Sequence, residues 1–167
     1  MKIDIIKDNN QYDEQIAQVI LKAFKQDNEV KLVKAVKENS DYYISYIALV
    51  NDIVVGHVLI SPMLLNGQKT ILSLAPISVL DEYQNTGIGT QLIRKALSEA
   101  CRNDDYKLVT VLGSEHYYQR FGFKPYNIKK FNLPFEIENR YFHILEIEEN
   151  VLNELEGNFD YPTYFNI

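Results

Sequence analysis

The sequence predicts a mixed α/β fold in which helices pack against a central sheet. Short apolar, β-branched runs alternate with segments whose apolar residues recur at helical spacing. Two turn dipeptides, Asn51-Asp52 and Asn66-Gly67, separate three consecutive apolar runs and predict two β-hairpins. No repeat, low-complexity stretch or Pro/Gly-rich linker interrupts the 167 residues. We therefore expect one domain over 1–167.

The expected elements follow the order β-α-α-β-β-β-α-β-α-β. A short strand at 2–6 precedes two amphipathic helices at 12–26 and 28–39, each with apolar residues on one face. A third helix begins after Gly87 and runs to about Cys101, with Ile88, Leu92, Ile93, Ala96 and Leu97 facing inward. A short fourth helix is expected at 115–121. The other strands are expected at 42–50, 53–61, 69–80, 107–113 and 140–148.

Charge and cysteine content restrict the possible partners. The formal net charge is −6, which argues against a nucleic-acid partner because phosphate backbones require a basic face. With one cysteine, Cys101, no intramolecular disulfide can form, and we expect this side chain to pack in the structure rather than act as a nucleophile. No apolar segment is long enough for a signal peptide or a membrane span, so the expected location is cytoplasmic, without a membrane partner.

The segment ISVLDEYQNTGIGTQLIRKALSEA, residues 77–100, predicts an anion site. A helix N-terminus presents unpaired N–H groups and partial positive charge, and Gly87 and Gly89 allow a bulky anion to approach the backbone. A glycine-rich turn that binds nothing is the alternative. Two familiar phosphate loops do not match: a Walker loop needs Lys-Ser/Thr after Gly89, and a dinucleotide fingerprint needs glycine in place of Leu92.

The segment Gln84-Asn85-Thr86-Gly87-Ile88-Gly89 resembles the acetyl-CoA-binding motif of the GNAT N-acetyltransferase superfamily. The family's second motif, Tyr-x-x-x-Gly-Phe, is matched by YYQRFGF at 117–123, and the resemblance covers nearly the whole chain. The variant VLGSEHYYQRFGFKP is most similar to a bacterial subgroup with a C-terminal extension ending in YP…F, here Tyr161-Pro162 and Phe165. The chain departs from many relatives at Asp81, where they carry proline, and at Asn85, where they carry glycine. Asparagine tolerates left-handed conformations, so the site remains feasible.

The resemblance implies the GNAT fold, a mixed and mostly antiparallel sheet, with a core of about 1–125 and an extension of about 126–167. It implies that this sheet splays open near Pro76. Independently, Pro76 cannot donate to a ladder, which predicts a bulge or a locally unpaired strand. The aromatic tail of the extension either lines an acceptor pocket or caps the core.

The resemblance also implies an activity: transfer of the acetyl group of acetyl-CoA to a primary amine by direct attack on the thioester. The cofactor-binding residues would then be Ile77, Ser78 and Val79 along the pantetheine arm, and Gln84, Asn85, Thr86, Gly87, Ile88, Gly89 and Thr90 at the pyrophosphate. A backbone N–H of Ile77 or Val79 would polarise the thioester carbonyl. The alternatives are a non-catalytic acyl-CoA-binding sensor or assembly module and, less well supported, a nucleotide-binding domain.

By the same resemblance, Tyr118 corresponds to the tyrosine that protonates the departing thiolate of coenzyme A, with Tyr117 as the alternative for that role. The other reading of both rings is core packing. No general base is assigned, because Glu82 and Glu115 are expected to be solvated turn residues and His116 to be structural or exposed. No metal site is expected, since His57 and His143 lie in strands without ligand-spaced partners. The acceptor would be a small-molecule or protein amine, and nothing in the sequence decides whether the chain forms the homodimer common in the superfamily.

Overall fold

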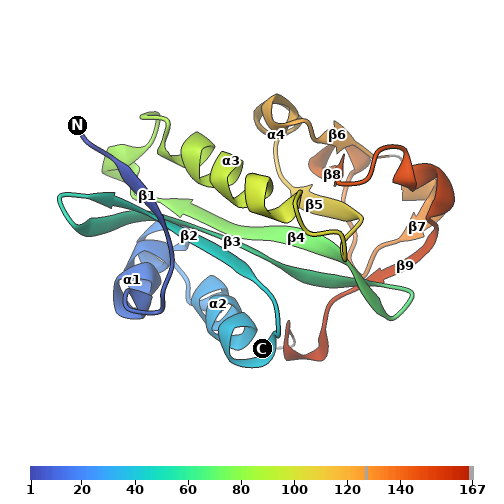
Figure 1. The fold of residues 1–167 in the computed structure, drawn as a ribbon, viewed down its shortest axis with the longest axis horizontal. Helices are drawn as coiled ribbons and strands as arrows, with labels where there is room; N and C mark the ends of the chain where they lie inside the picture. Colours follow the sequence, from blue (N-terminus) through green and yellow to red (C-terminus); the bar gives the residue numbers. More distant parts are fainter. Residues whose placement is uncertain (127, 166–167) are drawn as a thin grey trace.

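A three-layered arrangement is seen in the computed structural model, which describes residues 1–126 and 128–165. Residues 127 and 166–167 of the expected extension lie outside the described residues. The sheet separates α1 (Asp13–Phe24) and α2 (Asn28–Asn39) on one face from α3 (Ile88–Ala100) on the other (Figure 1). The short α4 (Glu115–Tyr118) lies on the same side of the sheet as α3, and Thr163–Phe165, at the end of the described residues, contact α2. The predicted mixed α/β class is confirmed.

The main sheet has the order β1-β2-β3-β4-β5-β8-β6, in which every neighbouring pair is antiparallel except β4 and β5. Its strands are β1 (Asp4–Lys7), β2 (Ile44–Val50), β3 (Ile53–Leu65), β4 (Gln68–Val79), β5 (Leu108–Leu112), β8 (Phe142–Glu146) and β6 (Lys124–Pro125). In the C-terminal part, β7 (Phe131–Asn132) pairs with β9 (Gly157–Asp160), which also pairs with the end of β3. The strands β6, β7 and β9 were not predicted from the sequence.

Both predicted hairpin turns are confirmed. Asn51 and Asp52 have φ angles of 50° and 62°, and Asn66 and Gly67 have φ angles of 51° and 79°. Two consecutive left-handed residues are the requirement of the tight turn that matches the twist of paired strands. Residue type therefore fixes the connections β2–β3 and β3–β4.

The inward face of α3 is the one predicted, and its five apolar residues are buried. Gly56 on β3 permits this close packing, since a Cβ there would lie 3.0 Å from Leu92 and 3.1 Å from Ile88. One expectation is wrong: Cys101 is exposed rather than packed. The buried face of the helix ends at Ala100, and Cys101 follows it as the C-terminal capping residue.

Two irregularities open the sheet beside Pro76. The β3–β4 register passes from Val58–Ile77 to Ile60–Leu74, so Ala75 and Pro76 together lie opposite a single residue of β3. The bulge predicted from Pro76 is therefore confirmed. The β4–β5 register ends at Ser73–Thr110, although β4 continues to Val79 and β5 to Leu112. Beyond that pair the two strands diverge, which leaves an open strand edge on β4.

Candidate functional site

A cavity of about 540 Å³ lies between the last residues of β4, the turn that follows and the first turn of α3. Eight of the ten residues predicted to bind the cofactor line it: Ile77, Ser78, Val79, Gln84, Asn85, Gly87, Gly89 and Thr90. The other two do not. Thr86 is exposed and its hydroxyl donates to the carbonyl of Tyr83, while the side chain of Ile88 is buried beneath the helix.

The turn into α3 presents backbone N–H groups to this cavity. Asn85 and Gly87 have φ angles of 61° and 86°, which turn the chain sharply before Ile88 begins the helix. The first intrahelical bond runs from the Gln91 N–H to the Gly87 carbonyl, so the amides before Gln91 have no carbonyl one turn behind them within the helix. No acidic residue lies in the first turn, so the positive end of the helix is not neutralised there.

The edge of β4 supplies a second set of backbone groups. The Leu80 N–H donates to the Val55 carbonyl across the β3–β4 ladder at 2.9 Å. Because hydrogen-bonding direction alternates along a strand, the amide of Ser78 also faces β3. The N–H and C=O groups of Ile77 and Val79 therefore face the opposite way, toward the edge that β5 leaves open. An extended ligand could pair with this edge as an added strand.

Three further residues line the cavity and were not assigned to cofactor binding from the sequence: Tyr83, Tyr117 and Arg120. The Arg120 guanidinium lies 4.7 Å from the centre of the Tyr117 ring and places a cation in the cavity wall. The three-residue spacing of this pair within YYQRFGF, which puts both on one helical face, is the signal that could have identified Arg120. Tyr117 also approaches Gly89, where an added Cβ would lie 2.9 Å from the tyrosine hydroxyl.

Tyr118 is the last residue of α4 and does not line the 540 Å³ cavity, but its ring centre lies 5.0 Å from that of Tyr117, which does. Its ring covers Gly113 so closely that a Cβ on that glycine would lie 2.5 Å from the ring, and it packs edge-on against Phe123. Burial, and to a lesser extent the neighbouring Tyr117, raises the pKa of Tyr118 to about 12. The phenol is therefore a protonated donor at neutral pH.

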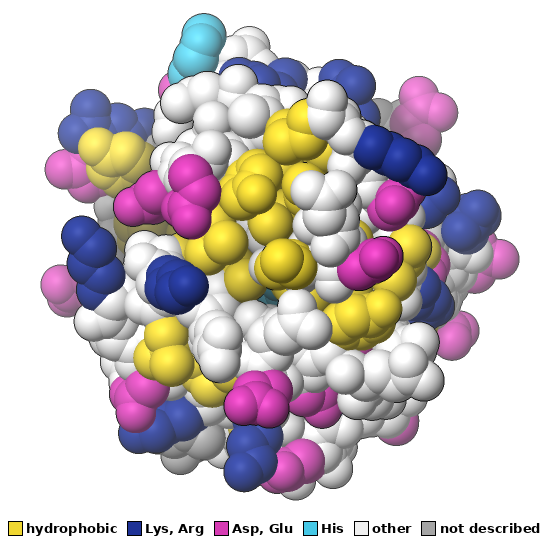
Figure 2. All heavy atoms as spheres, turned by 90° about the vertical axis from the view of Figure 1, so that its left-hand side faces the viewer, with side chains coloured by type: hydrophobic (Ala, Val, Ile, Leu, Met, Phe, Trp, Pro, Cys, Tyr) yellow, Lys and Arg dark blue, Asp and Glu magenta, His cyan; other side chains and the backbone are white. Residues whose placement is uncertain are grey.

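Figure 2 shows the end of the molecule that carries the connection from β4 to α3. Hydrophobic side chains gather in the middle of this face, and side chains of both charges are scattered around them. Basic residues do not collect there into a patch. Anion binding at the cavity would therefore depend on the backbone N–H groups of the turn and on Arg120 rather than on a broad basic surface.

A chain of buried polar groups lies on the α1–α2 face of the sheet. Lys37 is paired with Asp8 and with Asp13, and Ser45 donates to Asp8 at 2.8 Å. His57 Nε2 lies 3.0 Å from Ser45 Oγ. Because the Ser45 hydroxyl already donates its hydrogen to Asp8, its oxygen can only accept from His57, which places the imidazole proton on Nε2. Burial lowers the pKa of His57 to about 3 and keeps the ring neutral.

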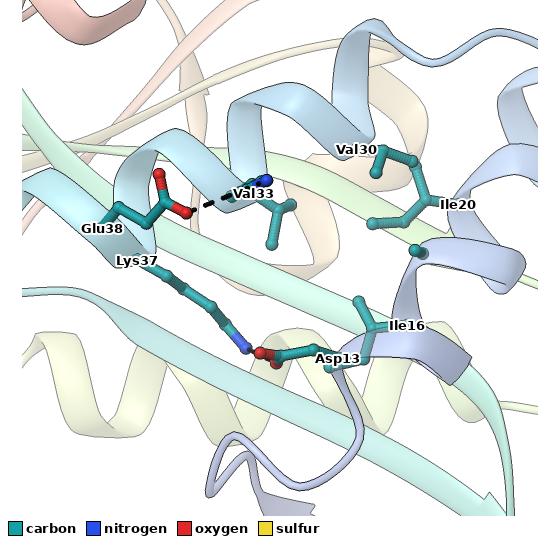
Figure 3. A pocket seen from close by; sticks show the side chains of 9 residues that line it. Asp13, Ile16, Ile20, Val30, Val33, Lys37 and Glu38 are labelled. Carbon is teal, nitrogen blue, oxygen red and sulfur yellow. Dashed lines mark hydrogen bonds and ion pairs between the residues drawn. The ribbon is translucent and has the colours of Figure 1, made fainter.

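A second cavity, of about 250 Å³, lies between α1 and α2 (Figure 3). Its walls are mainly aliphatic, and Ile16, Ile20 and Val33 point into it. Lys37 lies 2.7 Å from Asp13 at one end of the cavity, so this charge is already paired. The side chains here offer an apolar space rather than groups suited to catalysis.

Residues 1–126 and 128–165 contain neither a metal-binding group of side chains nor a membrane-spanning helix. Within this part of the chain, no three His, Cys, Asp or Glu side chains are grouped so that they could hold a metal ion. No helix in the same part has the length and apolar character needed to cross a membrane.

Comparison with known proteins agrees with this geometry. The family described as acetyltransferase (GNAT) domain matches residues 38–125. The uncharacterised N-acetyltransferase YhbS of Escherichia coli is 26% identical over 150 residues, which cover 89% of each chain. A GNAT acetyltransferase from Brucella melitensis, solved with acetyl-CoA, is 29% identical with a TM-score of 0.81 and covers 99% of both chains. The fold is also that of YhbS solved with CoA, with a TM-score of 0.90 at 24% identity over 100% of this chain and 93% of that one. The chain belongs to the GNAT acetyltransferase family.

Proposed function

We propose that the protein transfers the acetyl group of acetyl-CoA to a primary amine of a small molecule or a protein, by direct attack of the amine on the thioester. The observation that carries the proposal is the single cavity that joins the open edge of β4 to the N-terminus of α3. A pantetheine arm requires an extended strand edge and a pyrophosphate requires clustered N–H donors, and both lie in one wall. Two proteins of the same fold were solved with CoA or acetyl-CoA.

In this proposal the pyrophosphate binds the backbone N–H groups of the segment Gln84–Thr90, and Arg120 supplies the counter-charge. The pantetheine arm pairs with Ile77 and Val79. An amide of one of these two residues donates to the thioester carbonyl oxygen and stabilises the negative charge that develops there as the amine attacks. Thr86 and Ile88 would contribute only through their backbone amides.

Collapse of the tetrahedral intermediate breaks the carbon–sulfur bond and releases a thiolate, which takes up a proton. We propose Tyr118 as the donor, because its ring packs over Gly113 directly after β5, where the sheet opens, and a phenol is protonated at neutral pH. Tyr117 is the alternative, since it lines the cavity itself. The acceptor amine must be neutral when it attacks, and it loses a proton to solvent after the carbon–nitrogen bond forms.

Isothermal titration calorimetry with acetyl-CoA, ATP and NAD tests the binding step. We expect saturable binding of acetyl-CoA and none of the other two. Absence of acetyl-CoA binding by folded protein would overturn the proposal. Release of free CoA in the presence of a panel of primary amines then separates an enzyme from a non-catalytic acyl-CoA-binding module, which would bind without releasing thiol.

The two tyrosines are distinguished by a pair of matched variants. Tyr118→Phe should lower the rate of CoA release while leaving acetyl-CoA affinity unchanged, and Tyr117→Phe should do the same if it is the donor instead. If neither variant lowers the rate of CoA release, both phenols are excluded from the mechanism. We further propose that 1–167 acts as one N-acetyltransferase domain. The cytoplasmic location stays a prediction, and light scattering would decide whether the chain forms a homodimer, which the sequence leaves open.

A further inference from the structure

A smaller cavity, of about 80 Å³, is lined by the residues of β4 that precede those lining the proposed cofactor cavity. The larger cavity is lined by residues 77–79 of β4, and the smaller one by residues 73–75, with Pro76 between them. The opposite wall is formed by residues 110–112 of β5. The small cavity thus begins at Ser73–Thr110, where the β4–β5 pairing ends, and fills the gap between the diverging strands.

Aromatic side chains from the C-terminal part of the chain close this cavity. Phe135, Phe142 and Tyr161 line it, and the ring centre of Phe135 lies 6.1 Å from that of Tyr161 and 6.4 Å from that of Phe142. Met63 and Leu112 add further apolar surface. All three rings belong to the extension expected at about 126–167, so the extension lines a cavity in addition to packing against the sheet.

The polar side chains of the cavity wall are those of Ser73, Thr110 and Tyr161 among seven apolar residues, and the Thr110 hydroxyl is already engaged. The Thr110 hydroxyl lies 3.3 Å from the Leu72 carbonyl, to which it donates. An amine or alcohol in this space would bring N–H or O–H groups that need acceptors, and burying them unpaired is costly. A hydrocarbon chain brings none. Leu112, at the mouth of the gap, is 43% exposed and would lose apolar surface to such a chain.

We propose that this cavity binds the acyl group of the thioester, and that it accommodates short aliphatic acyl chains longer than acetyl, with propionyl and butyryl as the best fit. This inference rests on the proposed function, because it places the thioester at the junction of the two cavities beside Pro76. If a methylene needs about the 30 Å³ that a water molecule occupies in the liquid, the cavity holds roughly two or three carbons. The acetyl methyl would leave part of that space empty, and a hexanoyl chain would collide with the aromatic wall.

The acyl-chain series can be measured without knowing the acceptor. Titration calorimetry would compare CoA, acetyl-CoA, propionyl-CoA, butyryl-CoA and hexanoyl-CoA with the intact chain. Each buried methylene should tighten binding about fourfold, so butyryl-CoA should bind roughly 15-fold more tightly than acetyl-CoA. Hexanoyl-CoA should lose this gain.

The outcomes separate this inference from the proposed function. Binding of CoA and every thioester with equal affinity would overturn the acyl-site assignment and leave the cofactor site intact. Weaker binding of propionyl-CoA than of acetyl-CoA would also overturn it. If CoA and all four thioesters fail to bind, the proposed function itself fails.

Variants of the cavity wall make the test specific. Ala75→Val should fill the space and remove the gain from longer chains while leaving CoA affinity unchanged. Phe135→Leu should enlarge the space and move the best chain toward hexanoyl. Phe24→Ala, an exposed aromatic on α1 that lines neither cavity, is the control and should leave the series as in the wild type. Thermal unfolding confirms that each variant is folded; if Ala75→Val is not, the wild-type series and Phe135→Leu still decide.

Discussion

Replacement of Gly89 by alanine should separate ligand binding from stability. Gly89 is the second residue of α3 and lines the cofactor cavity. An added methyl group would lie 2.9 Å from the hydroxyl of Tyr117, which is the far end of a side chain and can move by a few tenths of an ångström. Alanine also favours the helix over glycine by up to about 1 kcal/mol. The free energy of unfolding should therefore change little or increase.

The same methyl group should obstruct the anion. It projects into the space where a phosphate would approach the backbone, and loss of one hydrogen bond to a charged group costs about 1.5–3 kcal/mol. Acetyl-CoA affinity should fall roughly tenfold to 150-fold. Calorimetry measures the affinity and urea unfolding the stability, with Ser98→Ala at the other end of α3 as control. Wild-type affinity in a folded Gly89→Ala protein would refute a phosphate position against this turn.

Three other predictions concern the turn and the buried polar chain. Gly87→Ala should lower the free energy of unfolding by about 1–2 kcal/mol in urea titrations, because its φ of 86° is left-handed and its nearest side-chain neighbour is 4.0 Å away. His57 stays neutral in the folded protein, whereas in the unfolded chain it binds a proton below pH 6.5, so the free energy of unfolding should fall by about 1.4 kcal/mol per pH unit between pH 6.5 and about 3. His57→Gln should remove this contribution to the slope in urea titrations at several pH values. An unchanged slope in the variant would contradict the assignment. Burial alone would raise the pKa of Asp8, but hydrogen bonds from Lys37, the Asn10 amide and Ser45 lower it. Asp8→Asn should therefore lower the free energy of unfolding by about 3 kcal/mol at pH 7. The difference from wild type should disappear as the pH falls below 3.8 and Asp8 itself becomes protonated.

The parts of the fold that were predictable are those governed by local chemistry. The turns at Asn51-Asp52 and Asn66-Gly67 require left-handed residues, and Pro76 cannot complete a ladder, so residue type alone indicated two hairpins and one bulge. The strands β6, β7 and β9 have only two to four residues each, and each forms because it pairs with a strand that is distant in the sequence. No periodicity can develop over so short a segment, so the sequence gives no signal for them.

The candidate site divides along the same line. The presence of Gly87, Gly89 and the strand at Ile77–Val79 in one cavity wall was predictable, because the proposed phosphate and extended arm would impose requirements on the backbone that residue type and order reflect. Arg120 and the aromatic wall at Phe135 and Tyr161 would act through side chains that reach the two cavities from segments following β5 in the chain. Their proposed roles depend on contacts between segments that are far apart in the sequence, and residue spacing within one segment does not predict such contacts.

Two neighbouring irregularities of β4 account for both cavities. Opposite Pro76 the β3–β4 ladder accepts an extra residue, and on its other side β4 has already parted from β5 after Ser73. The strand edge that results is open to an extended ligand at Ile77 and Val79 and faces an apolar gap at residues 73–75. A thioester held by the first segment would present its carbonyl at the boundary and its acyl chain to the second. Cofactor binding and acyl-chain selection would thus have the same structural origin, and a substitution that restored regular β4–β5 pairing would impair both together.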